Sequence, residues 1–334
     1  MTENYISRPH NKLEEKLRSG GFAVTAELGS IDSADPQAVL DEAAKFGDVV
    51  DAINVTDASG AHCHISSVAA SAILVQAGYT PILQMSCRDR NRIAMQGDIV
   101  GAAALGITNV LCLTGDGVQT GDHPQAKPVF DMDSVQAIQM TRHLRDKSAF
   151  LSGRELAEPP RMLIGGASNP FAPPFHIRAR RLQKKIQAGA DFVQSQYCYD
   201  VPRFKQFMQQ ARNMGLHNRV AYMVGVGPVK SPKTARWMRE NVPGVWIPDD
   251  IIDRLEKTPK KQRKAEGIKV CAEIIEQVRE IEGVRGVHIM AYRQEDTIPE
   301  ILRQTNLLPV EPEPEEEPIP VSFMEFALSG NLLL

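Results

Sequence analysis

The sequence has few cysteines and no long apolar run. Its five cysteines form no CxxC pair and are odd in number, which argues against a disulfide framework. No stretch approaches the roughly 20 apolar residues that cross a bilayer, and the N-terminus lacks the basic and apolar regions of a signal peptide. We therefore expect a cytoplasmic protein that does not associate with membranes.

An excess of positive charge, a glycine-rich phosphate loop and a metal-ligand motif are also missing. The formal net charge is −3, so no basic field recruits nucleic acid. Glu27-Leu28-Gly29-Ser30 follows the first expected strand and is no phosphate loop. His62-Cys63-His64 is metal-like, but neighbouring side chains on an extended segment point to opposite faces, so we expect no metal site.

What the chain does contain is a regular alternation of strand and helix patterns. Most of the apolar runs are nearly continuous, as in parallel strands that are buried on both faces. The expected strands are residues 22–27, 52–55, 81–85, 109–114, 162–167, 192–196, 220–224 and 287–290. Eight such units predict an α/β fold, a single-domain (β/α)8 TIM barrel over residues 1–308, with a doubly wound sheet as the alternative.

Helical patterns fill the intervals between these strands. The expected helices cover residues 36–45, 65–76, 92–105, 134–145, 176–188, 202–214 and 231–241, with extra helices over 249–257 and 264–281 before the last strand. Asp133 is expected to cap one of them, with Gln136 three residues on. Residues 309–334 read as an acidic, proline-rich linker and an apolar tail, which we expect to dock on the barrel or on a partner.

Carboxylates and amides occur where the expected strands end. Glu27, Gln84, Asp116 and Gln196 hold such positions, and Asp116 lies in a turn between two glycines. The carboxyl ends of barrel strands build the active site, so we expect one shared pocket. No Ser-His-Asp set accompanies them, which argues against nucleophilic and metal-assisted hydrolysis. The set favours a heteroaromatic ligand and leaves a carboxyl group for general acid catalysis.

Two basic segments have open roles. Arg178, Arg181 and Lys185 share one face of an expected helix that also carries Lys184. That face is either simply solvated or an anchor for a phosphate or diphosphate. The segment Arg88-Asp89-Arg90-Asn91-Arg92 either holds a charged substrate tail or caps a helix.

Taken together, these motifs resemble the methylenetetrahydrofolate reductase family of flavin-dependent barrels. The resemblance runs from Phe22 to Pro309, and its strength lies in the order and spacing of the pieces. The matching pieces are Thr25-Ala26-Glu27, Val55-Thr56-Asp57-Ala58, Leu83-Gln84-Met85-Ser86-Cys87, Leu113-Thr114-Gly115-Asp116 and the segment 182–200.

The resemblance implies bound FAD and hydride transfer between 5,10-methylene- and 5-methyl-tetrahydrofolate, in one-carbon metabolism and methionine biosynthesis. Glu27 matches the general acid, Asp116 the acid that binds the pterin near the flavin, and Gln196 an amide that contacts the pterin. Gln84 matches a substrate position. The implied flavin positions are Thr56, Asp57, Gln84, Gly115, Asp116, Arg181, Lys184, Lys185 and Ala190.

The chain departs from the family pattern at several points. Many members have His where Gln84 stands and Arg where Thr114 stands, and an aromatic residue is common where Pro232 stands. The electron donor is therefore open between NADH, NADPH and a partner flavoprotein, as is the direction of the reaction. Alternatives are a non-redox pterin-binding methyltransferase or lyase, and a reductase subunit fed by a partner through its tail. We expect a homo-oligomer.

Overall fold

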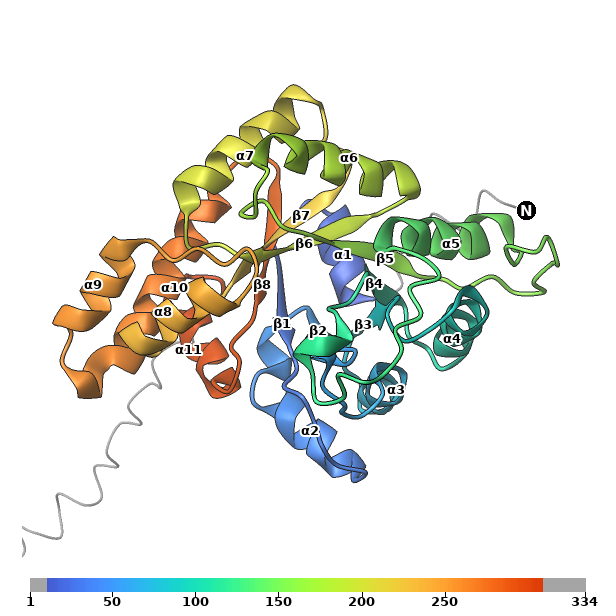
Figure 1. Cartoon of the computed structure of the whole chain (residues 1–334), viewed down its shortest axis with the longest axis horizontal. Coiled ribbons are helices and arrows are strands. Elements are labelled where there is room, and N and C mark those ends of the chain that lie inside the picture. Colours follow the sequence, from blue (N-terminus) through green and yellow to red (C-terminus); the bar gives the residue numbers. More distant parts are fainter. Residues whose placement is uncertain (1–10, 309–334) are drawn as a thin grey trace, which may run out of the picture.

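The fold is a closed barrel of eight parallel strands surrounded by helices (Figure 1). The structure is a computed structural model that describes residues 11–308, so the predicted tail over 309–334 lies outside the described residues. The strands follow one another around the barrel in chain order, and β8 closes it against β1. The predicted (β/α)8 TIM barrel is confirmed. The strands are β1 (Ala23–Glu27), β2 (Ala52–Val55), β3 (Pro81–Ser86), β4 (Asn109–Leu113), β5 (Leu163–Ser168), β6 (Phe192–Tyr197), β7 (Ala221–Val226) and β8 (Val284–Ile289).

The helices lie on the outside of the barrel. They are α1 (Lys12–Arg18), α2 (Pro36–Ala44), α3 (Ser67–Gln76), α4 (Arg92–Ala104), α5 (Ser134–Lys147), α6 (Arg178–Ala188), α7 (Val201–Asn213), α8 (Pro232–Asn241), α9 (Asp249–Lys257), α10 (Arg263–Arg279) and α11 (Ile298–Arg303). The extra helices α9 and α10 precede β8, as predicted, whereas α1 and α11 are additional. None of the helices in the described part of the chain is long and apolar enough to span a membrane.

Local capping explains where several helices begin. The Asp133 carboxylate accepts hydrogen bonds from the N–H groups of Val135 and Gln136, and the Gln136 side chain accepts one from the Asp133 N–H, which confirms the predicted capping box. The Asn91 side chain likewise caps α4 by accepting from two backbone N–H groups. The polar residues between strand and helix are therefore used to start helices at the rim.

The barrel interior changes from apolar to polar along the strands. Side-chain direction repeats every second residue in a strand, so positions two apart point into the same space. Near the amino ends of the strands the interior holds an apolar cluster of Ala23, Ala52, Ile82, Leu111, Phe192 and Met223. Two residues further along, it holds a buried polar layer of Thr25, Asn54, Gln84, Gln194 and His288.

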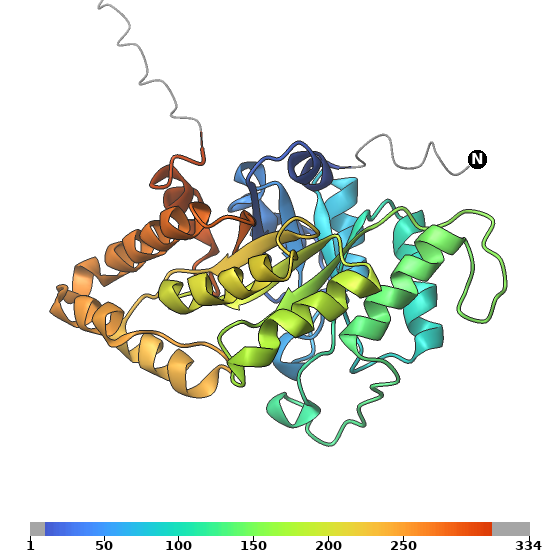
Figure 2. The same cartoon turned by 90° about the horizontal axis from the view of Figure 1, so that it is seen from above.

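Helix α1 packs against the amino end of the barrel. Leu13 of α1 is fully buried and joins the apolar cluster of the interior. Asn11 caps this helix, and its amide nitrogen donates to Thr108 Oγ1 at 2.9 Å and to Asn109 Oδ1 at 3.0 Å, next to the start of β4. Figure 2 shows α1 (dark blue) and the loop that follows β4 (green) at opposite ends of the barrel. The open end is therefore the one formed by the carboxyl ends of the strands.

Candidate active site

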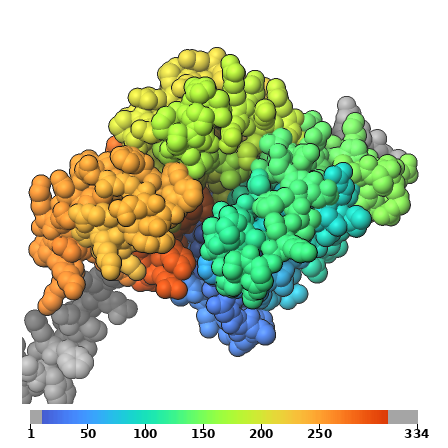
Figure 3. Space-filling model, in the orientation of Figure 1, coloured from blue at the N-terminus to red at the C-terminus, as the bar shows by residue number. Residues whose placement is uncertain are grey.

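A cavity of about 650 Å³ opens at the carboxyl ends of the strands. Its volume lies in the range of roughly 300–1,000 Å³ that small-molecule sites occupy. Figure 3 shows a hollow on this face, between the orange, yellow-green and green parts of the surface. The polar and charged residues of its wall include Glu27, Gln84, Thr114, Ser134, Arg178, Arg181, Lys184, Lys185, Gln194, Gln196 and His288.

Glu27 lies at the end of this cavity that adjoins the barrel interior. It is the last residue of β1, and its side chain is 30% exposed. Its Oε2 accepts a hydrogen bond from Gln84 Nε2 at 3.2 Å and lies 3.8 Å from His288 Nε2. The structure thus brings Glu27 and Gln84 together, as predicted, and adds a histidine. A carboxyl group in this position can exchange a proton with a ligand in the cavity.

Gln196 lines the same cavity from β6. The pairing of β6 with β7 shifts register between Gln194 and Tyr197, so the strand is irregular where Gln196 projects. Gln196 Oε1 accepts from the Tyr197 N–H at 3.0 Å, and Gln196 Nε2 donates to the Pro243 carbonyl at 3.4 Å. Each end of the amide keeps one hydrogen-bonding position for a ligand.

A cationic wall faces these residues from α6. Arg178, Arg181, Lys184 and Lys185 all line the cavity, and none forms an ion pair with a carboxylate within residues 11–308. Arg178 instead donates to the Ala172 and Pro173 carbonyls. Burial lowers the pKa of Lys185. An anionic group in the cavity would compensate these unpaired charges.

The amino end of α5 adjoins this wall but is already saturated. The Ser134 N–H donates to Thr114 Oγ1 at 3.2 Å, and the next two N–H groups donate to Asp133. Lys185 Nζ reaches the same place and donates to Ser134 Oγ at 3.2 Å. An anion bound here would therefore depend on the side chains of α6 rather than on helix N–H groups.

Asp116 lies on the rim and does not line the cavity with Glu27 and Gln196, contrary to the prediction. Gly115 has φ = 91°, where any other residue is strained, and an added Cβ would collide with Ser86 Oγ. This turn directs the exposed Asp116 carboxylate toward the loop after β2, where it accepts from the Gly60 N–H at 3.2 Å.

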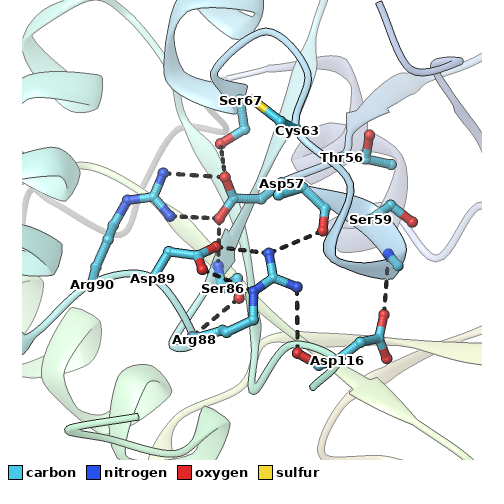
Figure 4. A network of polar contacts seen from close by, with 12 residues as sticks. Thr56, Asp57, Ser59, Cys63, Ser67, Ser86, Arg88, Asp89, Arg90 and Asp116 are labelled. Carbon is cyan, nitrogen blue, oxygen red and sulfur yellow. Dashed lines mark hydrogen bonds and ion pairs between the residues drawn. The ribbon is translucent and has the colours of Figure 1, made fainter. Parts of the chain in front are cut away.

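Asp57 is held in a network of polar contacts rather than in the cavity wall (Figure 4). Its Oδ1 accepts from Ser67 Oγ at 3.0 Å and from Arg90 at 3.1 Å, and its Oδ2 accepts from the Ser86 N–H at 2.7 Å and from Arg90 at 2.6 Å. Its side chain is only 6% exposed. Its acceptor positions are therefore used within the protein, and the predicted cofactor contact through Asp57 stays a prediction.

Two further predicted flavin positions lie away from the cavity wall. Thr56 is largely buried, and its hydroxyl lies 3.5 Å from His64 Nε2. Ala190 is buried between α6 and the amino end of β6, where its N–H donates to the Lys185 carbonyl at 3.0 Å. Because the cavity lies at the other end of β6, Ala190 cannot touch a ligand there, contrary to the prediction.

The arginine-rich segment after β3 pairs internally. Arg88 is 2% exposed, binds the carboxylate of Asp89 and donates to the Ala58 carbonyl at 3.0 Å (Figure 4). Arg90 pairs with Asp57 and Asp98, and Arg92 holds the pKa of Asp131 at about 2. Of the two roles considered for this segment, the structure shows the helix-capping one and uses its charges to join neighbouring loops.

His288 is a residue of the cavity wall that the strand-end positions did not include. The eighth expected strand, residues 287–290, ends at Met290. The missing signal was the two-residue period, because His288 stands two residues before Met290 and points into the same space. The same step back from Glu27 and Gln196 leads to Thr25 and Gln194, which complete the polar layer.

The remaining candidate groups form no second site in the described part of the chain. No cluster of three or more His, Cys, Asp or Glu residues within 11–308 could hold a metal ion. Cys87, Cys112, Cys198 and Cys271 are buried, and burial raises the pKa of Cys112 to about 11 and that of Cys87 to about 12. Such thiols stay protonated near neutral pH and are poor nucleophiles.

Residues 12–306 match the family model described as methylenetetrahydrofolate reductase. The chain is 24% identical over 248 residues to a probable methylenetetrahydrofolate reductase (NADPH) of Caenorhabditis elegans, covering 74% of this chain and 35% of the relative. It is 26% identical over 211 residues to methylenetetrahydrofolate reductase (NADH) 1 of Arabidopsis thaliana, covering 61% and 34%. The chain thus spans about a third of the length of these relatives.

A solved structure shares the fold. It is that of an uncharacterized protein from Clostridium thermocellum that binds two copies of 5-methyl-5,6,7,8-tetrahydrofolic acid. Its TM-score is 0.58 at 13% identity, over 88% of this chain and 98% of that chain. At this level of identity the likeness concerns the fold alone.

Proposed function

This chain belongs to the methylenetetrahydrofolate reductase family, and from that premise we propose that it is an FAD-dependent oxidoreductase that interconverts 5,10-methylene- and 5-methyl-tetrahydrofolate. One observation carries the proposal. A single cavity has a carboxyl group, Glu27, at its barrel end and an unpaired cationic wall on α6. The first suits proton exchange with a folate, and the second suits the diphosphate of a dinucleotide.

The residues present fit FAD. Arg181, Lys184 and Lys185 would hold the diphosphate, because they reach the cavity without carboxylate partners and the helix N–H groups of α5 are already used. The flavin, when bound, supplies the hydride chemistry, whereas the protein supplies binding, orientation and electrostatics. Thr114, where many members carry Arg, is used here to accept from the Ser134 N–H.

On the folate side, the chain offers a proton donor and two amides. Glu27 would donate a proton to N10 of the methylene form and open its five-membered ring, and Gln84 and Gln196 would hold the pterin by hydrogen bonds. Asp116, on the rim, would act on a cationic folate only through its charge, because its carboxylate faces Gly60. The solved protein of the same fold that binds 5-methyl-5,6,7,8-tetrahydrofolic acid shows that such a barrel can accommodate a folate.

The proposal is tested by purifying the chain and recording its flavin absorption band. Bound flavin should then be reduced in stopped-flow experiments with NADH, NADPH and 5-methyltetrahydrofolate in parallel. Arg181→Gln should weaken FAD binding about tenfold, as expected for the loss of one charge-assisted contact. Arg180→Gln is the matched control, because Arg180 is exposed on the same helix and does not line the cavity.

Each outcome separates the candidate functions. Colourless protein that takes up no FAD would refute the proposal, and folate binding by such protein would support the non-redox pterin-binding alternative. Flavin that is reduced by 5-methyltetrahydrofolate but by neither nicotinamide would exclude both nicotinamides and favour a partner flavoprotein as the electron donor. Equal FAD affinity in the Arg180 and Arg181 variants would refute the role of the α6 wall.

A further inference from the structure

The polar layer beneath Glu27 carries an inference that rests on the proposed function and deepens it. We propose that His288 is a positioning residue for the general acid. Together with Gln84 it directs N–H groups at one oxygen of Glu27, Oε2, and so leaves the transferable proton on the other oxygen, Oε1, which is free to face the ligand. The Thr25 hydroxyl fixes the ring tautomer that this arrangement needs.

Two buried amides, those of Asn54 and Gln194, form a reciprocal pair. Asn54 Nδ2 donates to Gln194 Oε1 at 2.7 Å, and Gln194 Nε2 donates to Asn54 Oδ1 at 2.9 Å. The second N–H of Gln194 donates to Thr25 Oγ1 at 3.0 Å. Asn54 and Thr25 are fully buried and Gln194 is 3% exposed, so the orientation of each amide is set by its partners.

The Thr25 hydroxyl, which the amide pair orients, in turn sets the hydrogen-bonding role of His288 Nδ1. Its oxygen already accepts from Gln194, so its single O–H is the remaining donor. His288 Nδ1 lies 3.1 Å from Thr25 Oγ1, whereas the other possible acceptor, the Val287 carbonyl, lies at 3.5 Å. We assign the Thr25 O–H to the shorter contact, which makes Nδ1 the acceptor, and a neutral ring then carries its proton on Nε2.

The Nε2–H group is on the side of Glu27. His288 Nε2 lies 3.8 Å from Glu27 Oε2, which exceeds a hydrogen bond, so the proposal requires the carboxyl group to turn slightly toward the ring. Gln84 Nε2 donates to the same oxygen. Tyr197 does not compete, because its hydroxyl donates to the Met290 carbonyl at 2.8 Å.

The two N–H donors determine which carboxyl oxygen of Glu27 carries the proton. An oxygen that accepts from two N–H groups is disfavoured as the site of the carboxyl proton, so the proton is held on Oε1. In the reaction the O–H bond at Oε1 breaks, the proton passes to the folate nitrogen, and the carboxylate that forms keeps both hydrogen bonds at Oε2. The donors therefore stabilise the product of proton transfer while they orient the donor.

The first test is independent of activity. The ring nitrogens of His288 are observed by ¹⁵N NMR in the full chain at neutral pH, with His288→Gln used to assign the signals. We expect a neutral ring that is protonated on Nε2, and the Thr25→Val variant should show a mixture of tautomers. A ring that is protonated on Nδ1 in the wild-type protein, or a doubly protonated ring, would overturn the proposal whether or not the chain reduces folate.

The second test compares two substitutions at one buried position. Thr25→Ser keeps the hydroxyl group, whereas Thr25→Val keeps the shape and removes it. With 5,10-methylenetetrahydrofolate as the oxidant of reduced flavin, Thr25→Val should slow flavin reoxidation about tenfold relative to Thr25→Ser, a fraction of the effect of a general acid. The folate KM and the FAD affinity should be the same in both. Equal rates in the two variants, or loss of FAD affinity in Thr25→Val, would show a merely structural role.

Discussion

The substitution Asp57→Asn tests whether this residue holds the rim together or touches a cofactor. Each carboxylate oxygen of Asp57 accepts two hydrogen bonds, Oδ1 from Ser67 and Arg90 and Oδ2 from Ser86 and Arg90 (Figure 4). An Asn side chain in either orientation would therefore place an NH2 group against two donors. The substitution also removes the charge that compensates Arg90, which is itself only 18% exposed.

The magnitude follows from burial. Removing one partner of a buried ion pair costs about 3–5 kcal/mol. Arg90 keeps a second partner, Asp98, at 2.8 Å, so we expect the lower end, about 3 kcal/mol. At about 2 °C per kcal/mol for a chain of this size, the melting temperature should fall by about 6 °C. The Asp98→Asn variant is the matched control, because Asp98 is 38% exposed and its loss should cost under about 1 kcal/mol.

The assays are urea and thermal unfolding of flavin-free protein followed by far-UV circular dichroism, with FAD titrations at a temperature where all variants are folded. We expect the FAD dissociation constant of Asp57→Asn to stay within about threefold of wild type, a change below the tenfold that 1.4 kcal/mol produces. Unchanged stability combined with a large loss of FAD affinity would refute the reasoning and return Asp57 to the cofactor site.

Three further outcomes follow from the site. Glu27→Gln should retain FAD and its reduction by a nicotinamide but lose folate turnover, measured in the two half-reactions separately; unchanged turnover would remove Glu27 from the mechanism. Burial lowers the pKa of Lys185, so its ammonium group is lost at a lower pH than in an ordinary lysine. FAD affinity, measured by quenching of flavin fluorescence, should therefore fall as pH rises through that range, and Lys185→Arg should remove the fall. Reaction of folded protein with a thiol reagent at neutral pH should label Cys63 alone, because Cys63 is exposed whereas Cys87 and Cys112 are buried with raised pKa values. Rapid labelling of two or more thiols, counted by mass spectrometry, would contradict this.

The sequence predicted the barrel well because its signal is local. Continuous apolar runs of the right length mark strands that are buried on both faces, and each recurs before an amphipathic helix. The helix α1 escaped prediction because it is short, and its single fully buried residue, Leu13, gives little periodicity. The capping box at Asp133 was predictable, since both of its hydrogen bonds join residues three apart or less.

The site was predicted less completely because its contacts join distant parts of the chain. Glu27, Gln84 and Gln196 reach one cavity, as strand-end reasoning suggested, and the α6 cations line it as well. The direction of Asp116 depends on the turn at Gly115 and on a backbone N–H from the loop after β2, which no local pattern encodes. Likewise, no sequence pattern near Asp57 indicates that Arg90, 33 residues later, donates hydrogen bonds to both of its carboxylate oxygens.

Within residues 11–308, the packing of α1 closes the amino end of the barrel interior. Leu13 and the apolar cluster around it separate the polar layer from solvent at the amino end. Ligands, water and protons must therefore reach Glu27 from the mouth and leave by the same route. A molecule bound in the mouth of the cavity therefore also controls the access of water and protons to the carboxyl group of Glu27.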